Sequence, residues 1–584
     1  MYRILKQSNI AYILVAMIII ITLYLISIAL GITTTIVMNR SVYELNYSLL
    51  IYSPYNYVVI VISVLAIAIV GILRRNKVIP LLLMIYAVLY YIVMNDIHLV
   101  IYLTIALNIA SIIILFTKES KSFIKNSIHY LILTLIAIEI VTIAYVLFSS
   151  GNYYWELTPL IFERSIYAIP IAILPYIALA LLFKWIIDLI MKRRKRKYLI
   201  HINSIAKNSF IEENGLIIAI AIALILIMSP YLLNIGRPIK PISEDTEAYV
   251  HYLSKIEEKG FPPLITTNPN IIRHWRYVLQ RPLHFIILYA IYEGTKINPI
   301  VLLDYIHHII CIPIILFLIW LITKNLFNRT IAGLAVLLTS CSPLVISFRV
   351  GGFQANEMNL VLLLTYFLIL ITMKRSWYII SAIALGIVSW LIHPWTSAFF
   401  IISSIPFIFI LYRKDKNKRK LLNRVITVVP LILFPIAVLI VMQHKSLDIL
   451  EILGEIVFRT EYGALIRWSK ENIINILINV LTKIPSEMSI AIRFYCWSAL
   501  SMPFIYIPCL LTIYDPLTLS LSPIALASTT LFGRATYIFR ILMLVPYSIT
   551  AAIAYSRTNK YIQLLAILAN LNMSLQIVLN VVEV

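Results

Sequence analysis

The chain has 584 residues, of which 61% are hydrophobic, and its mean hydropathy is +0.94. A soluble domain is about half apolar, so this composition excludes an ordinary soluble protein. Apolar runs of about 20 residues, enough to cross a bilayer as a helix, recur along the whole chain. A β-barrel would instead show short segments of alternating polarity. The sequence therefore predicts an all-α, polytopic transmembrane helical bundle.

The net charge is +22, from 48 Lys+Arg against 26 Asp+Glu. Such an excess can indicate nucleic-acid binding, but cytoplasmic loops of membrane proteins also collect Lys and Arg. Most basic residues here fall in short loops on one predicted side, so we expect membrane lipid and no nucleic acid as a partner. The four cysteines lie in apolar runs and form no disulfide framework or metal-like spacing. Rich Ile, Tyr and Lys usage with only 14 Gly is typical of an archaeal-like genome.

The first half of the chain predicts seven spans, at residues 10–38, 57–73, 78–94, 97–117, 128–148, 165–191 and 215–233. The segments between them alternate in charge, and the most basic one is the run 192–197. By the positive-inside rule, the N-terminus is predicted to be cytoplasmic. Residue 234 onward is then expected outside the cell.

The second half predicts ten more spans, at 299–322, 330–348, 358–372, 377–392, 395–412, 425–442, 492–514, 516–532, 538–555 and 561–582. The total is about 17, with an extracellular C-terminus. Two long outer loops, about 234–298 and 443–489, are too polar to cross. Their amphipathic segments, such as 283–292, are typical of interfacial helices. The polar linker 201–214 divides an N-terminal six-helix transmembrane region, 1–212, from a module at 213–584.

An acidic cluster opens the first outer loop. Glu244, Asp245 and Glu247 follow a predicted span, and Tyr249 comes two residues later. A carboxylate in a partly dehydrated site can act as a general base or hold a divalent cation. Acidic residues behind a capping Ser243 are equally typical of a helix N-terminus. Both interpretations stay open.

Two further polar segments lie at predicted outer helix ends. The segment 349–357 predicts a glycine-built turn with a helix cap at Asn356. Alternatively, Glu357 is a second carboxylate of a functional site that also contains the acidic cluster at 244–247. At His393-Pro394-Trp395, a proline break with an interfacial Trp is weighed against a substrate contact by His393.

Basic and histidine residues give two more candidates. Arg534 and Arg540 begin a late span, where basic side chains snorkel or grip a phosphate. His307 and His308 are adjacent, so they are expected on different helix faces with a structural role. The chain has no phosphate-binding loop and no dinucleotide fingerprint. A nucleotide-driven pump is therefore not indicated.

Residues 215–555 resemble the GT-C superfamily of polytopic glycosyltransferases, which includes dolichyl-phosphate-sugar-dependent mannosyltransferases and oligosaccharyltransferases. Glu244-Asp245 with Tyr249 resembles the acidic motif of the first outer loop, and Arg281-Pro282-Leu283 resembles a following basic-proline motif. Two features depart from the pattern. Six extra helices precede the module, and the doublet is Glu-Asp instead of Asp-Glu. The spacing to Tyr249 favours Asp245 over Glu244 as the catalytic residue.

Glu357 resembles the second acidic position of the superfamily, and Arg540 resembles its late arginine near the carrier phosphate. The resemblance implies an inverting transfer from a polyprenyl-phosphate-linked sugar, with Asp245 or Glu244 as base. It further implies substrate contacts by Tyr249, Glu357, Arg534 and Arg540. His393 is a further candidate because of its place at a predicted outer helix end. Any divalent cation would be held by Asp245 and Glu357.

Two rival functions remain: a transporter or flippase of lipid-linked glycans, and a non-catalytic structural subunit. Transporters place ionisable residues near the bilayer midplane. Such residues are expected to be sparse here, because Lys184 and Asp188 lie toward a cytoplasmic end and Asp304 lies near an outer end. This pattern favours chemistry at the membrane surface over permeation.

Overall fold

A computed structural model describes residues 2–31, 33–38, 41–46, 53, 55–118, 121–148, 162–168, 209–233, 241, 244–263, 269–342, 345, 353–373, 377–443, 504–505, 508, 515–531 and 544–581. The predicted all-α membrane class is confirmed. Within these ranges, eight helices are long and apolar enough to cross a membrane, and three shorter apolar helices accompany them. The chain is therefore a multi-pass membrane protein. The total of about 17 spans stays a prediction, because spans such as 492–514 lie mostly outside these ranges.

The chain forms two compact units. Unit 1 combines Met1–Leu174 with Asn559–Gln576, and unit 2 holds Pro175–Thr558. The division expected at residue 212 stays a prediction. A single boundary would not place Asn559–Gln576 in the same unit as the N-terminal helices, where the structure has it.

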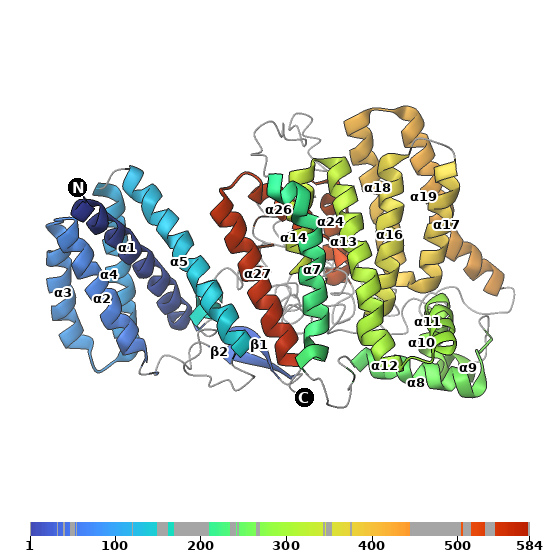
Figure 1. Cartoon of the computed structure of the whole chain (residues 1–584), viewed down its shortest axis with the longest axis horizontal. Coiled ribbons are helices and arrows are strands. Elements are labelled where there is room, and N and C mark those ends of the chain that lie inside the picture. The colour runs from blue at the N-terminus through green and yellow to red at the C-terminus, as the bar shows by residue number, and fades with distance from the viewer. Residues whose placement is uncertain are drawn as a thin grey trace, which may run out of the picture. The chain divides into compact units, whose positions relative to one another are not determined.

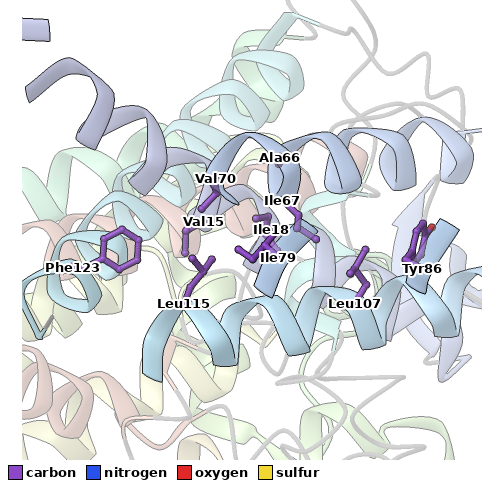
Figure 2. Close-up of a cluster of buried hydrophobic side chains, with 10 residues drawn as sticks. All are labelled: Val15, Ile18, Ala66, Ile67, Val70, Ile79, Tyr86, Leu107, Leu115 and Phe123. Carbon is purple, nitrogen blue, oxygen red and sulfur yellow. The ribbon is translucent and has the colours of Figure 1, made fainter. Parts of the chain in front are cut away.

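Unit 1 is a bundle of apolar helices. Its elements are α1 (Tyr2–Ala29), α2 (Tyr55–Leu73), α3 (Val78–Val93), α4 (Ile97–Lys118), α5 (Lys121–Phe148), most of α27 (Lys560–Val581) and a helical segment at 162–168. Figure 2 shows the apolar cluster that joins α1 to α4 and the start of α5, with Ile18, Ile67 and Leu107 among its members. Between membrane helices such clusters stabilise the bundle through close van der Waals packing.

The first predicted span, 10–38, extends beyond the end of the helix. Helix α1 ends at Ala29, and Gly31 takes a left-handed backbone conformation with φ of 59°. Strand β1 (Thr33–Met38) then pairs antiparallel with β2 (Ser41–Asn46). The run Thr-Thr-Thr-Ile-Val is β-branched and favours a strand, whereas hydropathy alone extended the helix to residue 38.

The expectation of sparse ionisable residues inside the membrane does not hold for α5. Glu139 lies within the candidate span Lys121–Leu147 and is completely buried. Glu163 and Arg164, from the helical segment 162–168, are buried as well. These three side chains belong to one hydrogen-bonded cluster of unit 1, which is treated below.

The apolar helices of unit 2 follow the predicted spans, and α17 and α24 begin at the predicted residues whereas the others begin earlier or later. They are α7 (Ser209–Leu233), α13 (His307–Leu326), α14 (Arg329–Ser340), α16 (Gln354–Thr372), α17 (Trp377–Ile392), α18 (Pro394–Asp415), α19 (Lys418–Gln443), α24 (Pro516–Leu531) and α26 (Tyr547–Tyr555). Helix α7 takes in the last six residues of the predicted linker. Helix α16 begins before Asn356, so Asn356 and Glu357 lie in its first turn and Asn356 is not the cap.

Small residues let α7 and α14 approach closely. A Cβ atom on Gly215 would lie 2.8 Å from the Cα atom of Gly333, and one on Gly333 would collide with the carbonyl oxygen of Ile211. Small residues at such crossings are typical of helix packing in membranes, where close backbone contact replaces hydrophobic burial. This contact fixes α7 against the body of unit 2.

The first predicted outer loop folds into short helices. They are α8 (Glu244–Lys259), α9 (Pro269–His274), α10 (Arg276–Gln280), α11 (Pro282–Thr295) and α12 (Pro299–Val301). A five-residue π-helix, η2 (Leu302–Ile306), joins α12 to α13. These short helices gather at one end of the long helices of unit 2 (Figure 1). The helix expected at 283–292 is therefore confirmed as α11, and its interfacial position stays a prediction.

Candidate active site at the start of helix α8

Helix α8 is amphipathic and carries the acidic cluster in its first turn. Tyr249, Leu253 and Ile256 are buried and pack against an apolar cluster that includes Phe285 of α11 and Leu303 of η2. Their spacing of four and three residues places them on one helix face. His251, Ser254, Glu257 and Glu258 are exposed. Packing therefore fixes the rotation of α8 and decides which acidic residues turn inward.

A tyrosine–arginine pair lies beside Asp245. Arg281 Nη1 donates a hydrogen bond to the hydroxyl oxygen of Tyr249, and its guanidinium carbon lies 5.5 Å from the centre of the Tyr277 ring. Burial raises the pKa of Tyr249; Arg281 opposes this shift and Asp245 adds to it. Tyr249 therefore stays a neutral phenol. Asp245 is half-buried whereas Glu247 is exposed, so of these two acidic residues Asp245 is the one that faces this pair.

A buried hydrogen bond ties α8 to the long helices. Thr246 Oγ1 donates to Asp304 Oδ1 at 2.6 Å, and Gln354 Nε2 donates to Thr246 Oγ1 at 3.2 Å. Asp304 lies in η2, and π-helical turns are frequent at functional sites. The residue next to Asp245 is thus held from both α16 and the π-helix. The position of Asp245 depends on buried groups that are distant in sequence.

The adjacent histidines converge on Glu357, which corrects the prediction that they point apart, whereas their structural role stays a prediction. Glu357 Oε2 lies 2.6 Å from His308 Nδ1 and 3.5 Å from His307 Nε2. His307 also bonds the carbonyl oxygen of Gln354 at 3.0 Å. The two rings reach one carboxylate because His307 approaches it with Nε2, the ring nitrogen farther from its backbone, and His308 with Nδ1, the nearer one. The polar group around Glu357 is therefore larger than the sequence indicated.

His393 belongs to the same polar layer. It caps α18, with its side chain accepting from the Thr396 backbone amide, and Pro394 takes the first helical position. The proline therefore starts a helix, as proline at a first turn can. Thr396 Oγ1 donates to Asn356 Oδ1 at 2.5 Å, and Asn356 is the neighbour of Glu357. His393 is connected to the Glu357 group in this way.

His284, which follows the Arg281-Pro282 motif, completes the interior of the site. It is fully buried, and its ring packs edge-on against Tyr249 and His307 at centroid distances of 5.3 and 5.9 Å. Burial lowers its pKa well below the ordinary value of 6.5, and His307, Arg281 and His393 add to the shift. His284 is therefore neutral, and it contributes no charge to a site that already holds Arg281.

The structure brings four of the seven predicted site residues into one region: Asp245, Tyr249, Glu357 and His393. The side chain of Glu244, together with Arg534 and Arg540, lies outside the described residues. Sequence reasoning missed Asp304, His284 and the role of the adjacent histidines. Arg281 was visible only as part of a motif. Where the structure describes the chain, no three His, Cys, Asp or Glu side chains converge as metal ligands, and the divalent cation stays a prediction.

Residues 287–441, from α11 into α19, match the family described as dolichyl-phosphate-mannose-protein mannosyltransferase. This family belongs to the GT-C superfamily of membrane glycosyltransferases. Residues 287–441 therefore resemble a GT-C glycosyltransferase. The predicted resemblance is thereby confirmed and it supports a glycosyltransferase as the enzyme class, whereas the inverting mechanism stays a prediction. The matched residues include Asp304, Glu357 and His393, whereas Asp245 and Tyr249 precede them. No curated protein and no solved structure matches the chain.

Proposed function

We propose that this protein moves a sugar from a polyprenyl-phosphate carrier to an acceptor hydroxyl at the outer face of the cell membrane. The observation that carries the proposal is the placement of Asp245. It lies beside the Tyr249–Arg281 pair, in a helix that Thr246 ties to Asp304 within the family-matched region. A surface carboxylate, a cation and a family of lipid-dependent transferases therefore point to one reaction.

In the proposed reaction, Asp245 removes the proton from the acceptor hydroxyl. The acceptor oxygen attacks the anomeric carbon from the side opposite the phosphate, so the configuration inverts. The bond between that carbon and the phosphate oxygen breaks, and its electron pair leaves with the lipid phosphate. A guanidinium can stabilise this developing charge. Arg281 supplies one near Asp245, and Arg534 and Arg540 remain candidates from the sequence.

Tyr249, Glu357 and His393 are proposed to bind substrate. Tyr249 accepts from Arg281 and keeps its own O–H proton for a further hydrogen bond. Glu357, held by His307 and His308, would accept from sugar hydroxyls at the inner side of the site. A buried acid held by neighbouring side chains is well placed to fix a polar ligand, because side chains locked by a second layer of contacts hold their geometry.

The orientation is part of the proposal. We infer a cytoplasmic N-terminus, an extracellular C-terminus and an outer position for α8 to α11. The basic segment between α18 and α19 supports it: Arg413, Lys416, Lys418 and Arg419 are exposed, as expected of a short cytoplasmic loop.

The experiment is a transfer assay on purified protein in lipid nanodiscs with a panel of polyprenyl-phosphate sugars. Asp245→Asn should reduce transfer by about 10²–10⁴-fold, the contribution typical of a general base. Glu247→Gln is the matched control, because Glu247 is exposed in the same helical turn, and it should keep wild-type transfer. Full activity of Asp245→Asn with loss in Glu244→Gln would move the base to Glu244. Full activity of both variants would rule out the mechanism.

A further inference from the structure

Unit 1 contains a buried ionisable cluster that lies outside the family-matched residues. It joins Glu139 of α5 to Glu163, Arg164 and Tyr167 of the segment 162–168, all of which are buried. Helix α27 contributes Asn572 and Gln576, with Thr142 of α5 beside them. Ionisable groups buried inside membrane helices are costly, and they often mark proton or ion sites.

The amide orientations in this cluster determine one another. Arg164 donates from Nε and Nη2 to Gln576 Oε1, at 3.2 and 3.0 Å, which leaves Gln576 Nε2 as a donor. That nitrogen lies 3.2 Å from both Glu163 Oε2 and Asn572 Oδ1. Asn572 Nδ2 then donates to Glu139 Oε2 at 2.8 Å. The network is self-consistent in this arrangement, so the roles of donors and acceptors are fixed from Arg164 to Glu139.

The two carboxyl groups have unequal surroundings. Both oxygens of Glu139 accept hydrogen bonds: Oε1 from the Tyr167 hydroxyl at 2.7 Å and Oε2 from Asn572. Such bonds favour the ionised form of a carboxyl group. Glu163 accepts only at Oε2, and its Oε1 atom is buried without a hydrogen-bond partner among the described residues. Glu163 is therefore the poorer site for a negative charge.

Charge counting shows that the cluster needs one proton. Two carboxylates and one guanidinium would leave a net negative charge enclosed by apolar helices, which costs several kcal/mol. One added proton makes the cluster neutral. Among the described residues, Arg164 and Gln576 act directly on Glu163, whereas Glu139 interacts with Glu163, Arg164 and Tyr167. Helix α27 contributes the neutral amides of Asn572 and Gln576 to this cluster. A metal ion needs several oxygen ligands, whereas Glu163 Oε1 is the uncommitted carboxylate oxygen here.

We propose that unit 1 holds a proton-binding site in which Glu163 carries the proton and Glu139 is ionised opposite Arg164. The site is separate from the proposed sugar transfer, because none of its groups belongs to residues 287–441. Loss of this proton would leave an uncompensated charge among the helices. Unit 1 would therefore respond to proton availability.

Infrared difference spectroscopy of the full-length protein in nanodiscs at neutral pH tests the proposal. The wild-type spectrum minus that of Glu163→Gln should contain the carbonyl band of a protonated carboxyl group, with its shift on exchange into D2O. Glu163→Gln replaces one neutral group by another of nearly the same shape, so its melting temperature should match the wild type. Glu139→Gln removes the charge that balances Arg164 and should melt at a lower temperature.

Three results would overturn the proposal. The first is a difference spectrum without the protonated-carboxyl band. The second is a Glu163→Gln variant that fails to fold or melts no higher than Glu139→Gln, which would show that Glu163 is not the neutral partner. The third is a wild-type melting temperature that rises with sodium at constant ionic strength and loses that dependence in Glu163→Gln, because the site would then hold a metal cation.

Discussion

The two units both bury carboxylates, but their polar networks end in different places. In unit 1, every group from Glu139 to Gln576 is enclosed, and the hydrogen bonds stay within α5, the segment 162–168 and α27. In unit 2, Glu357 and Asp304 are equally buried, yet the network continues through Thr246 into the first turn of α8. There Asp245 is half-buried and Glu247 is exposed. A closed network suits an internal proton site, and an open one suits surface chemistry.

Substitution of Arg281 should change the rate of sugar transfer more than any other substitution that distinguishes the two networks. Arg281→Met removes a cation that interacts with Asp245, and loss of such a charge-stabilising group typically costs about 10²–10³-fold in rate. Transfer assays in nanodiscs check this expectation. Lys259→Met is the control, because Lys259 is an exposed cation at the end of α8. Wild-type transfer by Arg281→Met would remove Arg281 from the mechanism and leave the role to Arg534 or Arg540.

Thr246 tests whether the buried network positions Asp245. Thr246→Val keeps the shape of the side chain but withdraws the donor from buried Asp304, which should cost about 1–3 kcal/mol of stability. Transfer should fall in the variant that remains folded, by about tenfold, because Asp245 is the adjacent residue. Thr246→Ser keeps the hydroxyl and should restore most of the transfer. Equal transfer by the two variants would mean that Asp245 does not depend on this bond.

The smallest expected effect is a dependence of stability on pH in unit 2. The pKa of buried His284 lies well below 6.5, so folded His284 stays neutral while the unfolded chain takes up a proton below about pH 6.5. Its contribution to stability is fully present above that pH and decreases as the pH falls. The free energy of unfolding should decline by at most about 1.4 kcal/mol per pH unit.

Thermal unfolding at about pH 7.5 and about pH 5.5, on either side of the ordinary histidine value, measures this dependence. His284→Phe should lose less stability on acidification than the wild type. His251→Gln, at an exposed position of α8, should behave like the wild type. Equal acid sensitivity of His284→Phe and the wild type would mean that other groups dominate.

Local patterns in the sequence predicted most of the described helices and half of the candidate site. Helical periodicity located α8 and α11, and the acidic first turn drew attention to Asp245. Contacts between distant residues were beyond such patterns: His308 meets Glu357 across 49 positions, and Asn572 meets Glu139 across 433. The adjacent histidines were set aside because helix geometry separates them, and only the position of α16 brings them to one carboxylate. Hydropathy also hid β1, since a β-branched strand and a helix end are both apolar.

Membrane sidedness of α8 tests the central claim most directly, because sugar transfer from an outer-leaflet carrier requires Asp245 to face the exterior. A cysteine at the exposed position of Glu258 should react with a membrane-impermeant thiol reagent in intact cells. A cysteine at exposed Lys418, in the basic segment between α18 and α19, should react only after the cells are permeabilised. The account predicts this pattern, with wild type treated with the same reagent as the background. Labelling of the Glu258 position only after permeabilisation would contradict it.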